Sequence, residues 1–376
     1  MLRRIASKSL AHLSGVLLAA SMAFPSTTFQ VTITKESKID KVQAGYYRMK
    51  VGDIEIISLS DGTITSDVTL LLTNAKPGEV AKLLAASDVE EPIDSAMNAF
   101  LILVGDRVIL VDTGAGNLLG PKCFKLPKSL KAAGYTPEQV TDILISHIHI
   151  DHVGGLVDGE RRVFPNAVVH VSKKELDFWT DKSIRENFPA LMQEFFQIAD
   201  KTMGPYVASN QVKSFDGTVQ LFPGITTEPA YGHTPGMSYY VVESKGKKLV
   251  LWGDTMNIPE VQFANPSITI QFDVDSQQAA VQRKKAFADA AKNRYLIALP
   301  HMHFPGVGHV QRDGSGYRFI PVPYINDAQK SPAPSREPMP VAPSRAAGPQ
   351  PRRWRLSLAP GRPLRRGAFK PAQWDE

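Results

Sequence analysis

The chain contains very little cysteine, because Cys123 is the only one among 376 residues. No disulfide can therefore form within the chain, even in an oxidising compartment, and its stability must come from packing. A Gly-x-Ser-x-Gly motif is also missing, which argues against nucleophilic catalysis by serine. The sequence has no repeat of fixed period, and its 43% hydrophobic content is that of a globular protein with a substantial core.

Basic side chains are concentrated at the two ends of the chain and are scarce in its middle. Residues 1–28 carry three basic and no acidic side chains, and residues 329–376 carry ten basic and three acidic ones. Within the total charge of +6, the body between these segments therefore has a net charge of −4. Because the part expected to fold is slightly acidic, the sequence argues against a nucleic-acid enzyme.

Long hydrophobic runs are also rare, and the one near the N-terminus is short. Three basic residues within positions 1–8 precede an apolar run at residues 13–24, and residues 21–23 fit a small-x-small cleavage site. The run is too short for a membrane span. We expect residues 1–28 to be a signal peptide that directs the protein to the periplasm or the exterior, without stable membrane insertion after processing. An uncleaved amphipathic tail is the alternative.

The composition divides the remainder into three parts. Residues 29–44 are polar and predict an extended N-terminal segment, and residues 45–327 predict one catalytic domain. The last segment, residues 328–376, holds ten of the 28 prolines and little aliphatic periodicity. Such a segment cannot bury enough apolar surface to offset the entropy of ordering, so we expect a disordered tail. A basic tail for an acidic surface is the alternative, and an extension without a catalytic role is favoured.

Short apolar runs alternate with helical patterns through residues 45–327 and predict an α/β domain. Strands are predicted at 51–59, 100–104, 107–112, 140–146, 168–171, 238–242, 248–252 and 295–299. Helices are predicted at 126–134, 173–180 and 279–292. The run at 140–146 is almost continuously apolar, which is typical of a strand covered on both faces.

Three histidines and one aspartate follow this strand within six positions, in the order His147-Ile-His149-Ile-Asp151-His152. Such a group at a strand end has no simple structural explanation and predicts a metal site. His147 and His149 can aim at one metal, while Asp151 and His152 turn toward a second. Imidazole and carboxylate ligands together suit zinc, with iron or manganese as substitutes.

Three further candidate ligands lie downstream in loops or at strand ends. His233 lies in a loop rich in turn residues, Asp254 follows the predicted strand at 248–252, and His301 follows the strand at 295–299. His303 lies two residues after His301, so which of the two binds metal is open. The other histidines, His12, His170 and His309, are interpreted as structural or exposed.

This order of motifs, from about Gly45 to Tyr324, resembles the metallo-β-lactamase superfamily. The resemblance implies an αββα four-layer sandwich that binds two divalent metal ions, with zinc expected. It assigns one metal to His147, His149 and His233, and the other to Asp151, His152 and His301. It makes Asp254 a bridge between the metals beside a bridging hydroxide, with Asp151 and Asp254 as the catalytic carboxylates. Asp112 resembles the family's carboxylate that orients a ligand histidine, and His301 rather than His303 fits the family pattern.

Stretches outside the ligands resemble methyl parathion hydrolases and their lactonase-like relatives, at residues 45–49, 130–135, 174–179, 284–291 and 304–309. The resemblance implies a substrate pocket that contains Trp179, Phe196 and Ile258. Packing in the core is the alternative for the two aromatic residues. Leu118 and Leu119 stand where methyl parathion hydrolase would have a pocket phenylalanine, and Thr65 and Asp67 make the loop in the 60s more polar. Both departures concern substrate preference.

The resemblance implies hydrolysis of neutral organophosphate triesters by a metal-bridging hydroxide. Two metals about 3.5–4 Å apart lower the pKa of a bridging water to roughly 7, and an aryl leaving group needs no general acid. An apolar pocket suits an uncharged triester or a lactone as the small neutral partner. A lactonase or aryl esterase is the alternative, and a homodimer is implied by resemblance.

Two rival classes are weaker. A non-catalytic metal-binding scaffold is disfavoured because all seven candidate ligands are present. A redox member of the superfamily would carry a flavin domain, for which the C-terminal segment leaves no room.

Overall fold

The computed structural model describes residue 43 and residues 45–325. The predicted signal peptide and C-terminal tail lie outside these residues, as do the domain boundary at 327 and all but one residue of the predicted segment 29–44. The chain divides into two units, residues 1–323 and 324–376, and the architecture described below is that of the first. Among the described residues, no helix is long and apolar enough to cross a membrane.

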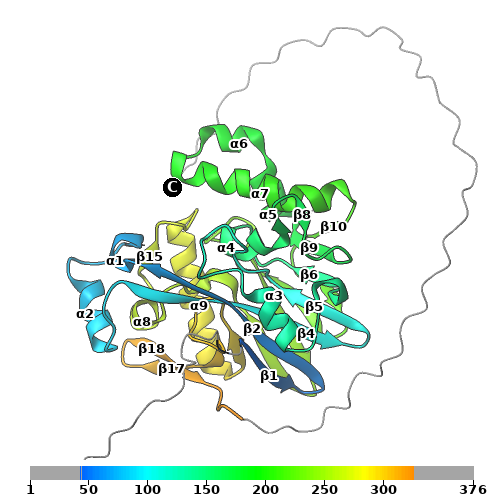
Figure 1. Cartoon of the computed structure of the whole chain (residues 1–376). Coiled ribbons are helices and arrows are strands. Elements are labelled where there is room, and N and C mark those ends of the chain that lie inside the picture. The colour runs from blue at the N-terminus through cyan, green and yellow to red at the C-terminus, as the bar shows by residue number, and fades with distance from the viewer. Residues whose placement is uncertain (1–42, 44, 326–376) are drawn as a thin grey trace, which may run out of the picture. The chain divides into compact units, whose positions relative to one another are not determined.

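The first sheet has seven strands in the order β1-β2-β4-β5-β6-β9-β10 (Figure 1). Its strands are β1 (Tyr46–Val51), β2 (Ile54–Ser66), β4 (Ile93–Val104), β5 (Arg107–Val111), β6 (Asp142–Leu144), β9 (Val168–Ser172) and β10 (Val212–Phe215). The pairs from β1 to β5 are antiparallel, whereas β5, β6, β9 and β10 pair in parallel. The carboxyl ends of the parallel strands therefore meet at one edge.

The second sheet also has seven strands, in the order β11-β12-β13-β14-β16-β17-β18. Its strands are β11 (Gln220–Phe222), β12 (Ile225–Pro229), β13 (Ser238–Ser244), β14 (Lys247–Leu251), β16 (Leu296–Ala298), β17 (Val307–Asp313) and β18 (Gly316–Pro321). Only β14 and β16 pair in parallel. Two small ribbons complete the strands: β3 (Leu72–Thr73) with β15 (Thr269–Ile270), and β7 (Val157–Asp158) with β8 (Arg161–Arg162).

Nine α-helices are present among the described residues. They are α1 (Val68–Leu71), α2 (Glu79–Ala86), α3 (Leu126–Ala132), α4 (Ile150–Val153), α5 (Lys173–Thr180), α6 (Lys182–Asn187), α7 (Ala190–Ala208), α8 (Pro259–Gln262) and α9 (Ser276–Asn293). Single 3₁₀ turns occur at η1 (Pro137–Gln139), η2 (Gly154–Leu156) and η3 (Gly253–Thr255).

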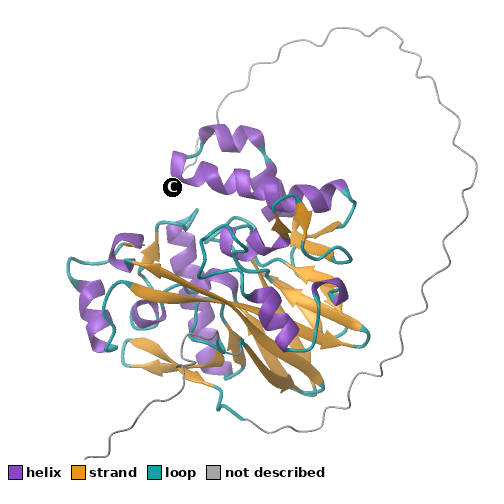
Figure 2. Ribbon diagram, in the orientation of Figure 1, coloured by secondary structure: helices purple, strands orange, loops and turns teal. Residues whose placement is uncertain are grey.

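Three apolar cores define a four-layer sandwich (Figure 2). The inner core joins the two sheets and contains Phe100 of β4 and Tyr240 of β13. A second core packs the outer face of the first sheet against α3, α5 and α7, and a third packs the second sheet against α9. The layers are thus helix, sheet, sheet, helix, which is the predicted αββα arrangement.

The double burial of β6 explains its continuous apolar sequence. Ile143 belongs to the outer core of the first sheet and Leu144 to the core between the sheets, and both are fully buried. Each such side chain contributes about 1.5–3 kcal/mol relative to an exposed one. The strand that carries the first candidate ligands is therefore anchored from both sides.

Most predicted elements agree with the structure, but the structure also contains elements that were not predicted, among them α7 and β10 to β12. Helix α5 and the β13–β14 hairpin lie where the sequence predicts them, but the predicted strand at 51–59 spans a turn. Gly52 and Asp53 form this turn between β1 and β2, and Gly52 has a φ of 59°. Hairpin β17–β18 extends the second sheet beyond the predicted last strand.

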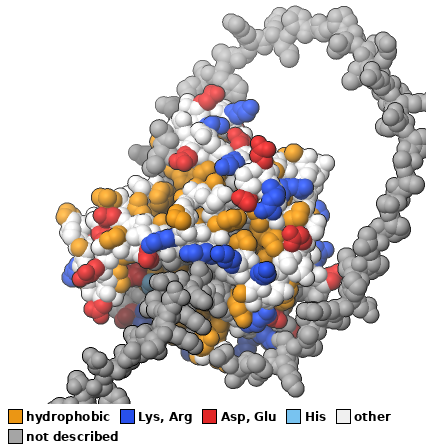
Figure 3. Space-filling model, in the orientation of Figure 1, with side chains coloured by type: hydrophobic (Ala, Val, Ile, Leu, Met, Phe, Trp, Pro, Cys, Tyr) orange, Lys and Arg blue, Asp and Glu red, His pale blue; other side chains and the backbone are white. Residues whose placement is uncertain are grey.

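Charged side chains of both signs are distributed over the face of the molecule drawn in Figure 3. This mixture agrees with the nearly balanced charge of the body, which carries a small net negative charge.

Candidate metal centre

The candidate ligands come together at one edge of both sheets, where strands end. His147 and His149 follow β6, and Asp151 and His152 lie on α4 immediately beyond them. His233 lies in the loop between β12 and β13.

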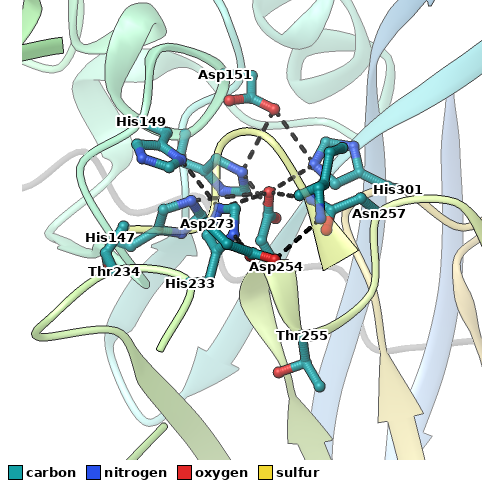
Figure 4. Close-up of polar contacts among 12 residues, drawn as sticks. His147, His149, Asp151, His233, Thr234, Asp254, Thr255, Asn257, Asp273 and His301 are labelled. Carbon is teal, nitrogen blue, oxygen red and sulfur yellow. Dashed lines mark hydrogen bonds and ion pairs between the residues drawn. The ribbon is translucent and has the colours of Figure 1, made fainter. Parts of the chain in front are cut away.

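The other two candidate ligands belong to the second sheet. Asp254 lies in η3 directly after β14, and His301 follows β16. Figure 4 shows the side chains of His147, His149, Asp151, His233 and His301 grouped around Asp254.

The seven side chains form two groups. Within each group, the potential ligand atoms all lie within 4.8 Å of one another. One group contains His147, His149 and His233 and is completely buried. The other contains Asp151, His152, Asp254 and His301, of which only Asp151 is partly exposed. These groups match those that the resemblance implies, with Asp254 among the members of the second group.

Asp254 lies between the two groups and contacts both. Its Oδ1 is 3.0 Å from Nε2 of His152, and its Oδ2 is 3.1 Å from Nε2 of His301. The same Oδ2 is 3.4 Å from Nε2 of His233 and 3.8 Å from Nε2 of His147. Asp254 could therefore offer a ligand oxygen to a metal ion in either group.

The donor set fits divalent metal ions. Nε2 of His147 is buried and forms no hydrogen bond, and Nε2 of His152 and Oδ1 of Asp254 are buried 3.0 Å from each other. Nδ1 of His149 lies 3.0 Å from Nε2 of His233, so two nitrogen lone pairs can face a common point. Buried polar atoms without partners are costly, and metal ligation would satisfy them. Three imidazoles in one group, with imidazoles and carboxylates in the other, suit zinc.

Asp112 orients the first histidine loop, as the resemblance implies. Its Oδ2 lies 2.9 Å from Nδ1 of His152 and accepts a hydrogen bond from the Ser146 hydroxyl, whose oxygen is 3.0 Å from Nδ1 of His147. Its Oδ1 accepts from the Ser146 backbone N–H. One carboxylate therefore fixes ligand rings that belong to different groups. Asp112 has a φ of 57°, so the turn after β5 is held in a conformation that is rare for non-glycine residues.

Asp273 holds His233 in the same way, and sequence reasoning did not find it. Its Oδ1 is 2.7 Å from Nδ1 of His233, and its Oδ2 accepts a hydrogen bond from the Ile270 N–H. The carboxylate is completely buried beside the buried guanidinium of Arg283, at 3.9 Å. Such a carboxylate fixes the tautomer and the direction of the ligand ring.

Two glycines allow the loop that carries Asp112 to pack against the ligand helix. A Cβ added to Gly154 would lie 2.2 Å from the Ala115 carbonyl oxygen, and one at Gly155 would lie 2.0 Å from that of Thr113. Any larger residue at either position would push the two loops apart. The glycine pair therefore permits the close approach of the two loops.

The electrostatics of the metal-free protein differ between the groups. Burial is the main cause that holds the pKa values of His147 and His149 well below their usual range. Burial also opposes the charge on His301, but Asp254 and Asp151 outweigh it and raise the pKa of His301 to about 10.

The carboxylate Asp254 shows the opposite balance. Burial favours its neutral form, but His152, His301 and His147 outweigh burial and hold its pKa well below the usual range. His152 is correspondingly raised well above its usual pKa, because Asp254, Asp151 and Asp112 together outweigh its burial. Imidazolium–carboxylate pairs thus balance the charge where a metal ion would bind.

Of His301 and His303, only His301 lies in one of the two candidate groups. His303 belongs to neither candidate group, and its side chain is 70% exposed. Its Nε2 pairs with Glu260 at 2.9 Å, and this hydrogen bond is the main cause of its raised pKa. His170 pairs with Asp142 at 2.9 Å, away from both groups, and His12 lies outside the described residues.

A cavity of about 330 Å³ opens onto both groups. Its wall is mostly apolar and includes Ile258, as expected, but neither Trp179 nor Phe196. Both rings are fully buried in the core beside the first sheet, so the structure agrees with the alternative interpretation of these two residues. The aromatic wall is formed instead by Phe195 and Phe272.

The departures noted in the sequence lie only partly in this cavity. Leu119 lines it, so the leucine pair does place an aliphatic side chain at the substrate wall. In the 60s, Ile64 and Ser66 line the cavity, whereas Thr65 points elsewhere and bonds to Asp94. These residues belong to β2 rather than to a loop, so alternate side chains point to opposite faces.

Replacing Asp273 with asparagine is expected to weaken metal binding by the three-histidine group by about 10–100-fold, which is typical of such supporting carboxylates. A neutral amide accepts a weaker hydrogen bond from His233 and no longer favours one tautomer. Metal content after dialysis against graded zinc concentrations measures the effect. Asp275→Asn is the control, because Asp275 caps α9 two residues away and contacts no candidate ligand. Equal zinc affinity of the two variants would contradict the role given to Asp273.

Comparison with known proteins agrees with this geometry. Residues 94–314 match the sequence profile of the metallo-beta-lactamase superfamily. The structure is similar to the crystal structure of the hydrolase AbOPH of the beta-lactamase superfamily, with 34% identity and a TM-score of 0.72, covering 76% of this chain and 100% of that one. It is also similar to AidC, a dizinc quorum-quenching lactonase in complex with a product, with 29% identity and a TM-score of 0.70, covering 75% of this chain and 99% of AidC.

Curated relatives are more distant. An N-acyl homoserine lactonase of Bacillus sp. is 25% identical over 216 residues, which are 52% of this chain and 77% of the lactonase. An N-acyl homoserine lactonase of Bacillus cereus is 24% identical over 42% of this chain, and the matched part spans about half (54%) of that protein. The profile match, the two sheets and the two ligand groups show that the chain belongs to the metallo-beta-lactamase superfamily and is a metal-dependent hydrolase.

Proposed function

We propose that the protein hydrolyses neutral organophosphate triesters of the methyl parathion type, within the methyl parathion hydrolase-like branch of the superfamily. The cavity is the observation that carries this proposal. Its apolar wall opens directly onto both ligand groups, so an uncharged ester can bury its apolar substituents while its P=O group faces the ligands.

The charges around the cavity support a neutral substrate. No lysine or arginine occurs among the described residues that line it, and Glu194 adds a negative charge. A phosphate diester, or a β-lactam with its carboxylate, would therefore find no cationic side chain at the wall. An uncharged triester, aryl ester or lactone needs none.

When bound, two divalent metal ions, which we propose are zinc, supply a water molecule of lowered pKa and a Lewis acid for the P=O oxygen. The chain's own residues fix the geometry. Asp254 holds the two groups at a set separation, since one carboxylate contacts His152 at 3.0 Å and His233 at 3.4 Å. Asp112 and Asp273 keep ligand rings in one orientation, and the apolar wall excludes bulk water from the reacting ester.

The cavity also favours a good leaving group. Apart from the candidate ligands, Glu194 is the only titratable side chain among the described residues of the wall, and it is exposed to solvent. A nitrophenolate leaves without a proton, whereas an alkoxide requires a donor. This difference supports an aryl triester as the preferred substrate.

Lactone hydrolysis is the second candidate function. It is favoured by the likeness to the dizinc lactonase AidC and to the Bacillus lactonases. A lactone is also a neutral ester of a size that an apolar cavity can accept.

A rate comparison on zinc-loaded protein tests the proposal. The substrates are methyl parathion, p-nitrophenyl acetate, N-hexanoyl homoserine lactone, a β-lactam and the anionic diester bis(p-nitrophenyl) phosphate. We expect the highest kcat/KM for methyl parathion and the lowest values for the anionic compounds. A higher kcat/KM for the lactone would replace the first candidate by the second. Two bound metals without turnover of any substrate would overturn both.

Phe195→Ala is expected to raise KM for methyl parathion by about 5–10-fold with a smaller change in kcat, because part of an apolar contact worth about 1.5–3 kcal/mol is lost. The Phe195 ring lies 4.5 Å from the His149 ring at the cavity wall. Phe196→Leu is the matched control, since the neighbouring ring is buried in the core. It should lower Tm and leave KM nearly unchanged. The reverse pattern would show that Phe195 does not contact substrate.

We also propose that the protein is exported, on the basis of the basic segment and apolar run within residues 1–28. Mass spectrometry of the protein recovered from the periplasm or the medium tests this. A mature N-terminus between residues 24 and 29 is expected, and retention of residues 1–28 in cytoplasmic protein would contradict it.

A further inference from the structure

Glu175 is a buried carboxylate that takes no part in ligation or in the cavity. It lies in the first turn of α5 and is completely buried. Its Oε1 accepts hydrogen bonds from the Ile148 N–H at 2.8 Å and the Trp179 indole N–H at 2.7 Å. Its Oε2 accepts from the Thr234 hydroxyl at 2.7 Å and the Gly236 N–H at 2.8 Å. Each oxygen therefore has two donors.

These donors belong to the two loops that carry the three-histidine group. Ile148 lies between His147 and His149, and Thr234 directly follows His233. The loops follow strands of different sheets, so only tertiary contacts hold the loops in position relative to each other. The carboxylate of Glu175 joins them, with one oxygen bonded to each loop.

The packing around Glu175 is close enough for this residue to fix the positions of the two loops relative to each other. A Cβ added to Gly236 would lie 2.1 Å from the Glu175 nitrogen, so the His233 loop rests directly on the start of α5. Trp179 holds the carboxylate through its indole N–H, and its ring contacts the His149 ring edge-on at 5.4 Å. Trp179 does not line the cavity, but through these contacts it supports Glu175 and the His149 ring.

A buried carboxylate at this position costs desolvation free energy. Burial raises the pKa of Glu175 despite the four hydrogen bonds, which means that its charge is poorly solvated. An apolar side chain would leave several donors without partners, and an amide would add donors where only donors are present. Among uncharged alternatives, none accepts from all four groups.

We infer that Glu175 is a positioning residue of the metal centre, which fixes His147 and His149 relative to His233. It controls the affinity of the three-histidine group and leaves the group of Asp151, His152, Asp254 and His301 intact. The inference concerns metal binding and holds for either candidate substrate.

Binding of Co²⁺ to the full chain tests the inference. In Glu175→Gln, the affinity of one of the two Co²⁺ sites is expected to fall by about 10–100-fold, as for other supporting carboxylates, and the visible absorption of that site should change. The second site should keep its affinity. Thr234→Val removes only one of the four hydrogen bonds and should give a smaller change in the same direction. It also preserves the test if Glu175→Gln does not fold.

Tyr206→Phe is the matched control. Tyr206 is also completely buried, and its hydroxyl donates to the Leu156 carbonyl and accepts from the Phe164 N–H, away from both ligand groups. This variant should lower Tm without changing the Co²⁺ spectrum. Wild-type affinity and spectrum in both Glu175→Gln and Thr234→Val would overturn the inference, as would an equal loss at both sites. Because hydrolysis is not measured, these outcomes are separate from failure of the proposed substrate.

Discussion

Asp254→Ala is expected to lower kcat/KM by about 10⁴-fold and to leave fewer than two metal ions bound. This factor corresponds to about 5.5 kcal/mol of lost transition-state stabilisation, at 1.36 kcal/mol for each tenfold change in rate. Asp254 is the only side chain whose carboxylate contacts members of both described ligand groups, at 3.0 Å from His152 and 3.4 Å from His233. Its removal takes away a ligand and the element that sets the separation of the groups. Steady-state kinetics together with metal analysis of the purified variant measure both effects.

Asp142→Asn is the matched control for this prediction. Asp142 is as deeply buried as Asp254, at 3% exposure for both, and it also pairs with a histidine, His170, at 2.9 Å. It lies at the opposite end of β6 from the candidate ligands. The control should lose stability but keep two metals and nearly full kcat. An Asp254→Ala variant that retains two metals and wild-type kcat/KM would refute its assignment as the bridging carboxylate.

The sequence predicts which side chains come together, because each of them follows a recognisable local pattern. His147 to His152 follow a strand that reads as doubly buried, and Asp254 and His301 each follow another strand. A strand end defines where the next side chains point, so the edge of the sheet could be inferred without coordinates. The alternation of strands and helices predicts an α/β domain, whereas the four αββα layers were implied by the resemblance to the superfamily.

The supporting carboxylates could not be found in this way. Asp273 lies forty residues after His233 in a segment without regular structure, and Glu175 lies in an amphipathic helix that reads as ordinary surface. Their contacts are with backbone N–H groups and ring nitrogens of remote loops, which leave no periodic signal. The orienting role of Asp112 could be predicted only from the resemblance to the family. Asp112 lies at the end of a predicted strand.

Of the three residues predicted to line the cavity, Ile258 does so and the two aromatic residues do not. For Phe196, the reason lies in the geometry of helix α7. On helix α7, Phe196 and Ala199 are buried in the core and do not line the cavity, whereas Phe195 and Ile198 line the cavity and also pack in or against that core. Successive helical residues are rotated by about 100°, so an error of one position exchanges core for cavity. Sequence alone does not show which apolar side of such a helix meets the sheet.

Metal binding by the group of Asp151, His152, Asp254 and His301 is expected to strengthen steeply with pH. In the metal-free protein, Asp254 and Asp151 outweigh burial and raise the pKa of His301 to about 10. A metal ion requires the neutral imidazole and must displace this proton below that pH. The affinity should therefore rise about tenfold for each pH unit between pH 7 and 9, and by up to about a hundredfold if His152, whose pKa is also raised, loses a proton as well. Asp254 adds no dependence, because its lowered pKa keeps it ionised throughout.

The three-histidine group supplies the internal comparison. Burial holds the pKa values of His147 and His149 well below their usual range, so these rings are already neutral at pH 7 and have no proton to lose. Isothermal titration calorimetry of zinc binding, in two buffers of different ionisation enthalpy, counts the protons released at each step. One step should release one to two protons and depend strongly on pH, and the other should release few and depend weakly on it. Two steps with equal proton release would show that the imidazolium–carboxylate pairs do not form in the metal-free protein, and that the two groups do not differ in the charge that a metal must replace.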